Sequence, residues 1–239
     1  MMDPRRERGS EEGEILLVDK PKGWTSFDVV HKVRNVLRVK RAGHAGTLDP
    51  LATGLLIVCT GKRTRDIGMF MGLEKEYEAE MCLGGETASY DCETPVVNLR
   101  STEGITADQI RKVLVEFVGW STQIPPMWSA AKVRGRRLYA YARRGEDVER
   151  KPREVHIRVL EAIAIDVPVV KFRVICSKGT YVRTLVHDVG RKLGCGAYLT
   201  ALVRTKIGDY SLHDAVTIEQ LVSAYRLQGI PSEGKLGAS

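Results

Sequence analysis

Long apolar runs are absent from this 239-residue chain. A membrane-spanning helix needs about 18 consecutive apolar residues, and no stretch approaches that length. The chain opens with MMDPRRERGS, which lacks the apolar core of a secretory signal peptide. The sequence therefore argues against a membrane protein and predicts a cytoplasmic location.

Cysteine pairs and the common cofactor motifs are also missing. The five cysteines are odd in number and widely spaced, without a CxxC pair, so neither a disulfide framework nor a zinc site is indicated. The P-loop, GxGxxG, HExxH and GxSxG motifs are absent. His44 and His187 are not spaced like metal ligands. We therefore predict an activity that uses neither a cofactor nor a metal ion.

Positive charge is plentiful and is concentrated in one segment. The whole chain carries a formal charge of +7, and Lys132 to Arg153 holds nine basic against three acidic residues. Such a run can be an ordinary solvated face. Here Trp128, Tyr139 and Tyr141 lie among or beside the cations, and flat rings among cations suit nucleic-acid bases and phosphates together. The segment therefore favours an RNA partner.

Hydrophobic periodicity predicts an α+β fold, with a mixed, largely antiparallel sheet flanked by helices. Residues 1–13 are expected to form a disordered tail, 14–228 one catalytic domain without an internal linker, and 229–239 a flexible tail. Thr25 or Ser26 is expected to cap the next helix, in which Phe27, Val30, Val33 and Leu37 follow helical spacing. Strands are expected at 15–18, 55–59, 77–83, 155–165, 169–176 and 197–205, and helices at 26–37, 106–118, 138–144, 181–193 and 218–227.

A glycine-rich loop is predicted for residues 41–54, and Asp49 lies within it, followed by Pro50. An aspartate before proline often only bonds the backbone of its own turn. The alternative is that the loop brings this carboxylate and His44 close to a ligand, because long loops between packed elements are often functional. The residues alone leave both interpretations open.

Several short blocks together resemble the TruB family of RNA pseudouridine synthases, over roughly residues 14–225. One block would carry little weight, but they occur in order along the chain. The blocks are KPKGWTS at 20–26, GHAGTLDPLATG at 43–54, KEY at 75–77, QIPPMWSA at 123–130, SKGTYVRTL at 177–185 and LGCGA at 193–197.

The resemblance implies that the chain converts the T-loop uridine of tRNA, uridine-55, into pseudouridine without a cofactor. Asp49 matches the catalytic aspartate of the family, and Arg183 matches the arginine beside it. Whether the carboxylate attacks the ribose, attacks the base or takes a proton from the sugar stays open. Other matches are Tyr77, which stacks on the base and is a candidate proton-transfer group, Tyr181 and Leu202, which line the pocket, and Lys20, which either contacts substrate or organises its loop.

RNA contacts are also implied by the resemblance. The target nucleotide must leave its stack to react, and His44 matches the residue that fills the vacated space. Residues 125–153 match an RNA-binding insertion of the family. Phosphate contacts there would position the RNA without reading its sequence. The cations expected to make them are Lys132, Arg136, Arg137, Arg143 and Arg144.

The chain ends at Ser239, which leaves too little room for the C-terminal RNA-binding domain, often of the PUA type, that many family members carry. We therefore expect a stand-alone enzyme, a monomer with no obligatory protein partner, acting on the T-loop and stem of tRNA. Two rival hypotheses are kept. One is a non-catalytic RNA-binding or tRNA-folding protein, and the other is a guide-dependent synthase.

Overall fold

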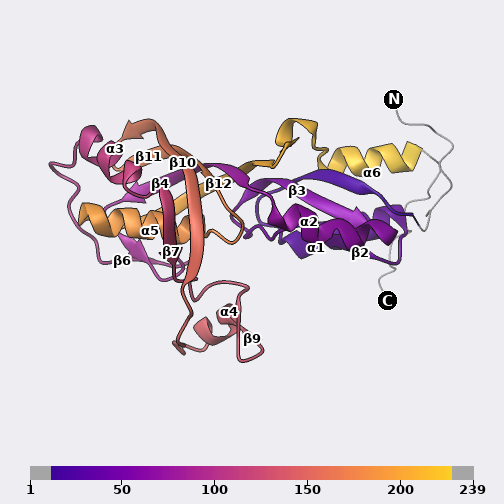
Figure 1. The fold of residues 1–239 in the computed structure, drawn as a ribbon, viewed down its shortest axis with the longest axis horizontal. Helices are drawn as coiled ribbons and strands as arrows, with labels where there is room; N and C mark the ends of the chain where they lie inside the picture. Colours follow the sequence, from indigo (N-terminus) through magenta and orange to yellow (C-terminus); the bar gives the residue numbers. More distant parts are fainter. Residues whose placement is uncertain (1–11, 228–239) are drawn as a thin grey trace, which may run out of the picture. The chain divides into compact units, whose positions relative to one another are not determined.

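The computed structural model describes residues 12–227, so most of both expected tails lies outside the described residues. The chain divides into two compact units (Figure 1). One unit comprises the residues up to 71 and those from 209 onward, and the other comprises residues 72–208.

The first unit is a small antiparallel sheet with helices packed on it. Strands β1 (Ile15–Lys20) and β2 (Ala42–His44) both pair antiparallel with β3 (Thr53–Thr60). Its core is formed by side chains such as Val18, Val33, Leu56 and Leu221. The remaining elements are α1 (Ser26–Leu37), a 3-10 helix (Gly61–Asp66), α2 (Ile67–Gly72), β13 (Tyr210–Ser211), a second 3-10 helix (Leu212–Asp214) and α6 (Ile218–Leu227).

Helix α1 begins where the sequence predicts. The Thr25 side chain accepts a hydrogen bond from the Asp28 backbone, and the Asp28 side chain accepts one from the Thr25 backbone, which forms a capping box. Among the four apolar residues at helical spacing, Phe27 is 70% exposed. The buried stripe runs instead through Ser26, Val29, Val30, Val33 and Leu37, and position 27 lies outside it.

The second unit is a five-stranded antiparallel sheet in the order β12-β4-β11-β10-β7. Helices α3 and α5 pack against β10 and β12 and cover one face of the sheet, here called the inner face; the other is called the outer face (Figure 1). The predicted α+β class with a largely antiparallel sheet is confirmed. The unit contains β4 (Lys75–Leu83), β5 (Glu86–Thr87), β6 (Val96–Val97), α3 (Ala107–Val115), β7 (Gly119–Gln123), β8 (Lys132–Val133), β9 (Arg136–Arg137), α4 (Leu138–Ala142), β10 (Arg153–Asp166), β11 (Val169–Cys176), α5 (Val182–Leu193) and β12 (Ala197–Ile207).

Strand β4 follows the predicted alternation, because Tyr77, Ala79, Met81 and Leu83 are all buried on the inner face. Strand β12 departs from simple alternation. Its pairing with β4 shifts by one residue between Leu199 and Ala201 and again between Arg204 and Lys206.

Other boundaries differ from the predicted ones. Helix α3 ends at Val115 rather than near 118, and the expected loop 41–54 contains β2 and the start of β3. Strand β7 was missed altogether. It is an edge strand that pairs only with β10, and it exposes Trp120, so its sequence shows no alternating apolar pattern.

Candidate functional site

The loop that carries Asp49 is held on both sides of this residue by the first residue of α1 and by the turn before that helix. The buried Ser26 hydroxyl accepts a hydrogen bond from the Leu48 N–H at 2.8 Å and lies 3.2 Å from the Leu48 carbonyl, to which it can donate. The Gly23 N–H donates to the Pro50 carbonyl at 2.8 Å. The blocks KPKGWTS and GHAGTLDP are therefore brought together, and the backbone on either side of Asp49 is fixed.

Lys20 and His44 belong to this same unit. Lys20 is fully buried, and its ammonium donates to the carbonyls of Pro21 at 3.0 Å and Trp24 at 2.6 Å. These bonds shape the turn that holds the Asp49 loop, which supports the organising role for this lysine. His44 is half-buried on β2, opposite Val58 of β3.

Tyr77 and Leu202 lie in the second unit, on the inner face of neighbouring strands. Tyr77 is 8% exposed and is paired directly with Arg204 of β12, while Leu202 is paired with Ala79. Arg204 is only 1% exposed, and sequence reasoning missed it, because a single arginine in a strand gives no functional signal. Lys75 is buried on the same strand as Tyr77, and its burial lowers its pKa to about 8.

Tyr181 stands at the N-terminus of α5 and is held by the buried side chain of Gln123. The Tyr181 N–H donates to the Gln123 side-chain oxygen at 3.0 Å, and the Gln123 amide nitrogen donates to the Tyr181 carbonyl at 3.4 Å. Two blocks that are distant in the sequence, QIPP and GTYVR, are therefore joined. The half-buried ring of Tyr181 projects from an anchored backbone.

Arg183 lies in the first turn of α5 and forms a buried ion pair with Asp91, at 3.4 Å between Nη1 and Oδ2. The side chains are 4% and 0% exposed. The guanidinium also donates to the carbonyls of Ser89 and Trp128, each at 2.8 Å. These contacts determine its orientation, since a guanidinium is planar and its donors have fixed directions. Sequence reasoning did not find Asp91, because an isolated aspartate in a loop carries no signal.

The predicted RNA-binding cations lie on the surface of the insertion. Lys132 is on β8, Arg136 and Arg137 are on β9, and Arg143 and Arg144 follow α4, and all five are exposed. The guanidinium carbons of Arg137 and Arg143 lie 5.9 and 5.3 Å from the centre of the Tyr139 ring. An aromatic ring flanked by cations is a suitable surface for a polyanion that carries bases.

A cavity of about 770 Å³ opens between the outgoing and returning arms of the insertion. Its lining includes four cations that were not singled out from the sequence: Arg134, Arg150, Lys151 and Arg153. Arg150 also donates to the Pro125 carbonyl at 3.2 Å and forms an ion pair with Asp147, which ties the two arms together.

Residues 12–227 contain no group of three or more His, Cys, Asp or Glu side chains able to hold a metal ion. Within the same range, no helix has both the length and the apolar character needed to span a membrane. All five cysteines are free thiols. The pKa of the buried Cys59 thiol is raised to about 11, mainly by desolvation, so it stays protonated at neutral pH.

Two family models match the chain. The model described as the N-terminal domain of TruB family pseudouridylate synthase matches residues 34–182. The model described as the C-terminal domain of tRNA pseudouridylate synthase B matches residues 183–234. Together they cover the Asp49 loop, the insertion, α5 and β12.

Curated relatives are similar over most of their length. A tRNA pseudouridine synthase B from Parabacteroides distasonis is 49% identical over 215 residues, which cover 87% of this chain and 92% of that protein. A relative of the same name from Phocaeicola vulgatus is 48% identical, with the same coverage.

Among solved structures, a chain of a Cbf5-Nop10-Gar1 complex is 31% identical, with a TM-score of 0.70. The match covers 92% of this chain and 57% of that chain, so this chain spans little more than half of the solved one. A structure of an H/ACA RNP bound to a substrate RNA gives a TM-score of 0.68 at 30% identity.

Proposed function

Since the chain belongs to the TruB family of pseudouridylate synthases, we propose that it isomerises uridine-55 in the T-loop of tRNA to pseudouridine. The observation that carries this proposal is the 48–49% identity to enzymes named tRNA pseudouridine synthase B, which extends over 92% of their length. The uridine must lose its bond between N1 and the ribose, rotate, and reattach through C5, so no atom is gained or lost.

Asp49 is the proposed catalytic carboxylate. The hydrogen bonds at Leu48 and Pro50 support this role, because a reacting group has to be held in place before the substrate arrives. A carboxylate can act as a nucleophile or as a base in this isomerisation without a cofactor. Arg183 is proposed to orient and stabilise the ionised carboxylate, because a guanidinium forms strong, directed hydrogen bonds with a carboxylate.

Tyr77 is proposed to stack on the target base, and Tyr181 and Leu202 to line the pocket around it. The inner-face placement of Tyr77 and Leu202 on paired strands supports a shared role. The base must leave its stack to reach them, and unstacking costs a few kcal/mol. His44 is proposed to fill the space that the base leaves.

The insertion is proposed to bind the T-stem backbone through its exposed cations. Its charge and its Tyr139 surface support this interpretation. Arg134, Lys151 and Arg153, which line the cavity, extend the proposed phosphate-binding surface. We further propose that one chain suffices, without a protein partner, and that it acts in the cytoplasm on tRNA.

The decisive test replaces Asp49 by asparagine, which keeps the shape and removes the charge. We expect no pseudouridine at uridine-55 of a tRNA transcript, with tRNA affinity and melting temperature unchanged. The wild type should convert uridine-55 in the bare tRNA transcript, and it should sediment as a monomer. Substantial product from Asp49→Asn would refute the catalytic role.

The same assay separates the two rivals. Activity of the wild type that requires an added guide RNA would indicate a guide-dependent synthase. A wild type that refolds tRNA but forms no pseudouridine under any condition would indicate a non-catalytic RNA-binding protein.

A further inference from the structure

Strand β12 carries two extra residues, Thr200 and Thr205. Leu199 pairs with Met81 and Ala201 with Glu80, so Thr200 has no partner of its own on β4. In the same way Arg204 pairs with Tyr77 and Lys206 with Glu76, which leaves Thr205 as the second extra residue. Each position is a one-residue β-bulge.

The two bulges decide which side chains of β12 face Tyr77. A regular strand that starts with Leu199 on the inner face would also place Ala201, Val203 and Thr205 there, because side chains alternate. The bulge at Thr200 turns Leu202 and Arg204 inward instead, at 8% and 1% exposed, and the bulge at Thr205 then returns the buried Ile207 to the inner face. In the regular register Val203 would lie opposite Tyr77 in place of Arg204. The bulged register therefore places a buried cation beside Tyr77, and the contacts that hold the bulges bear on this arrangement.

Both bulges are fastened to β4 in the same way. The Thr205 hydroxyl lies 3.3 Å from the Glu76 backbone carbonyl and 3.3 Å from the Glu76 carboxylate. The Thr200 hydroxyl lies 3.1 Å from the Glu80 backbone carbonyl and 2.8 Å from the Glu80 carboxylate. Each is a glutamate–threonine clamp, and the two clamps are four residues apart on β4.

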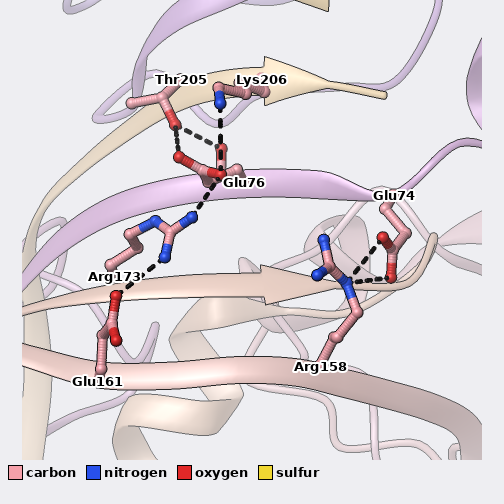
Figure 2. A network of polar contacts seen from close by, with 7 residues as sticks. All are labelled: Glu74, Glu76, Arg158, Glu161, Arg173, Thr205 and Lys206. Atoms are coloured by element: carbon pink, nitrogen blue, oxygen red, sulfur yellow. Dashed lines mark hydrogen bonds and ion pairs between the residues drawn. The ribbon is translucent and has the colours of Figure 1, made fainter. Parts of the chain in front are cut away.

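The Glu76 clamp is reinforced across the outer face of the sheet (Figure 2). Arg173 of β11 donates to Glu76 at 2.9 Å and to Glu161 of β10 at 2.9 Å, and Lys206 lies 4.0 Å from Glu76. Glu76 is 13% exposed, and the hydrogen bond from Arg173 lowers its pKa. At Glu80 the cation is Lys171 alone, at 3.9 Å.

We propose that Glu76 and Thr205 are positioning residues for the isomerisation, which rests on the proposed function. Thr205 directly follows Arg204, the residue opposite Tyr77, and Glu76 directly precedes Tyr77. The clamp holds the bulge at this point and so fixes how Tyr77 and Arg204 stand toward the base. The Glu80–Thr200 clamp has the same threonine–glutamate hydrogen bonds but supports the strand at a distance from Tyr77.

The test compares hydroxyl removal at the two bulges. Thr205→Val and Thr200→Val keep the side-chain shape and each remove one clamp. Both should lower the melting temperature by a similar few degrees. Thr205→Val should also lower kcat for pseudouridine formation about ten-fold at unchanged KM for tRNA, whereas Thr200→Val should keep kcat within about two-fold. Thr205→Ser retains the hydroxyl and should restore kcat.

Equal kcat losses in the two valine variants, or no recovery in Thr205→Ser, would overturn the positioning role. A rise in KM without a fall in kcat would also overturn it, because positioning acts on the bound base. An inactive wild type would refute the proposed function and this role with it. An active wild type whose two valine variants lose kcat equally would refute only the role of the clamp.

Discussion

The Asp49 loop and the insertion are both irregular segments, yet they are built in opposite ways. The loop is tied by its backbone on each side of Asp49, to the Ser26 side chain that begins α1 and to Gly23 in the turn before it. The insertion exposes most of its cations; at its root Arg150 ties its two arms together, and the Trp128 carbonyl accepts a hydrogen bond from Arg183 of α5. The difference indicates that bond-making needs fixed geometry, whereas attraction to a phosphate backbone tolerates movement.

The root of the insertion gives the largest expected effect. Asp91→Asn removes the carboxylate that faces Arg183, and changing one member of a buried ion pair costs about 3–5 kcal/mol. The comparison predicts that the free energy of unfolding depends strongly on this buried root and little on the exposed cations of the insertion. Urea unfolding measures the loss. Asp108→Asn is the control, since its pair with Arg111 at 3.0 Å is exposed and should contribute less than about 1 kcal/mol.

Loosening the Asp49 loop is expected to have the next largest effect. Ser26→Ala deprives the Leu48 N–H of its acceptor and frees the backbone beside Asp49. We expect kcat to fall about 100-fold with unchanged tRNA affinity, because a small misplacement of a reacting group has a large effect. Thr25→Ala serves as the control. It removes the cap of α1, which costs about 1 kcal/mol, but does not touch the loop. A rate loss as large in Thr25→Ala would show that helix stability, not the loop bond, is responsible.

Neutralising the exposed arginines of the insertion should weaken tRNA binding without changing the chemical step. With Arg136, Arg137, Arg143 and Arg144 all changed to alanine, we expect about ten-fold weaker tRNA binding and a flatter dependence on salt. The value of kcat at saturating tRNA should stay unchanged. Arg111→Ala with Lys192→Ala is the control, because both cations are exposed, lie outside the insertion and have carboxylate partners. If the salt dependence of tRNA affinity is unchanged in the quadruple variant, the basic segment is an ordinary solvated surface and not an RNA-binding one.

The smallest effect concerns the pH dependence of stability at Glu76. The hydrogen bond from Arg173 lowers the pKa of Glu76 below its ordinary value of 4.5. The contribution of Glu76 to stability is therefore present above about pH 4.5 and is lost as pH falls through the lowered pKa. The free energy of unfolding of the wild type should exceed that of Glu76→Gln at neutral pH, and the gap should narrow in acid. In an Arg173→Met background the narrowing should largely disappear.

Local patterns predicted much of the fold. The alternation in β4, the apolar stripe of α1 and the stop of α5 at Gly194 depend on neighbouring residues, so the sequence reveals them. Strand β7 was missed because an edge strand with exposed side chains has no apolar pattern. Phe27 matches the helical spacing but lies outside the stripe that α1 buries, which spacing alone does not reveal.

The site was predicted chiefly from the resemblance to a family, not from the pattern of the residues. Asp49 alone could have been a turn aspartate. The partners of the proposed site residues, such as Asp91 for Arg183 and Gln123 for Tyr181, come from distant parts of the chain. No local sequence pattern predicts such contacts, because they form only when the elements pack together.

The two bulges of β12 also bear on which length changes this strand tolerates. Deleting Thr200 or Thr205 alone removes one bulge and leaves every other paired residue of β12 opposite its present β4 partner. Deleting both leaves an unbroken alternation in which Leu199, Leu202, Arg204 and Ile207 keep the faces they have now. The two deletions are therefore independent of one another, since neither changes the pairing at the other bulge. The doubly shortened strand would retain its inward-facing residues but lose both clamps and the local twist that bulges introduce.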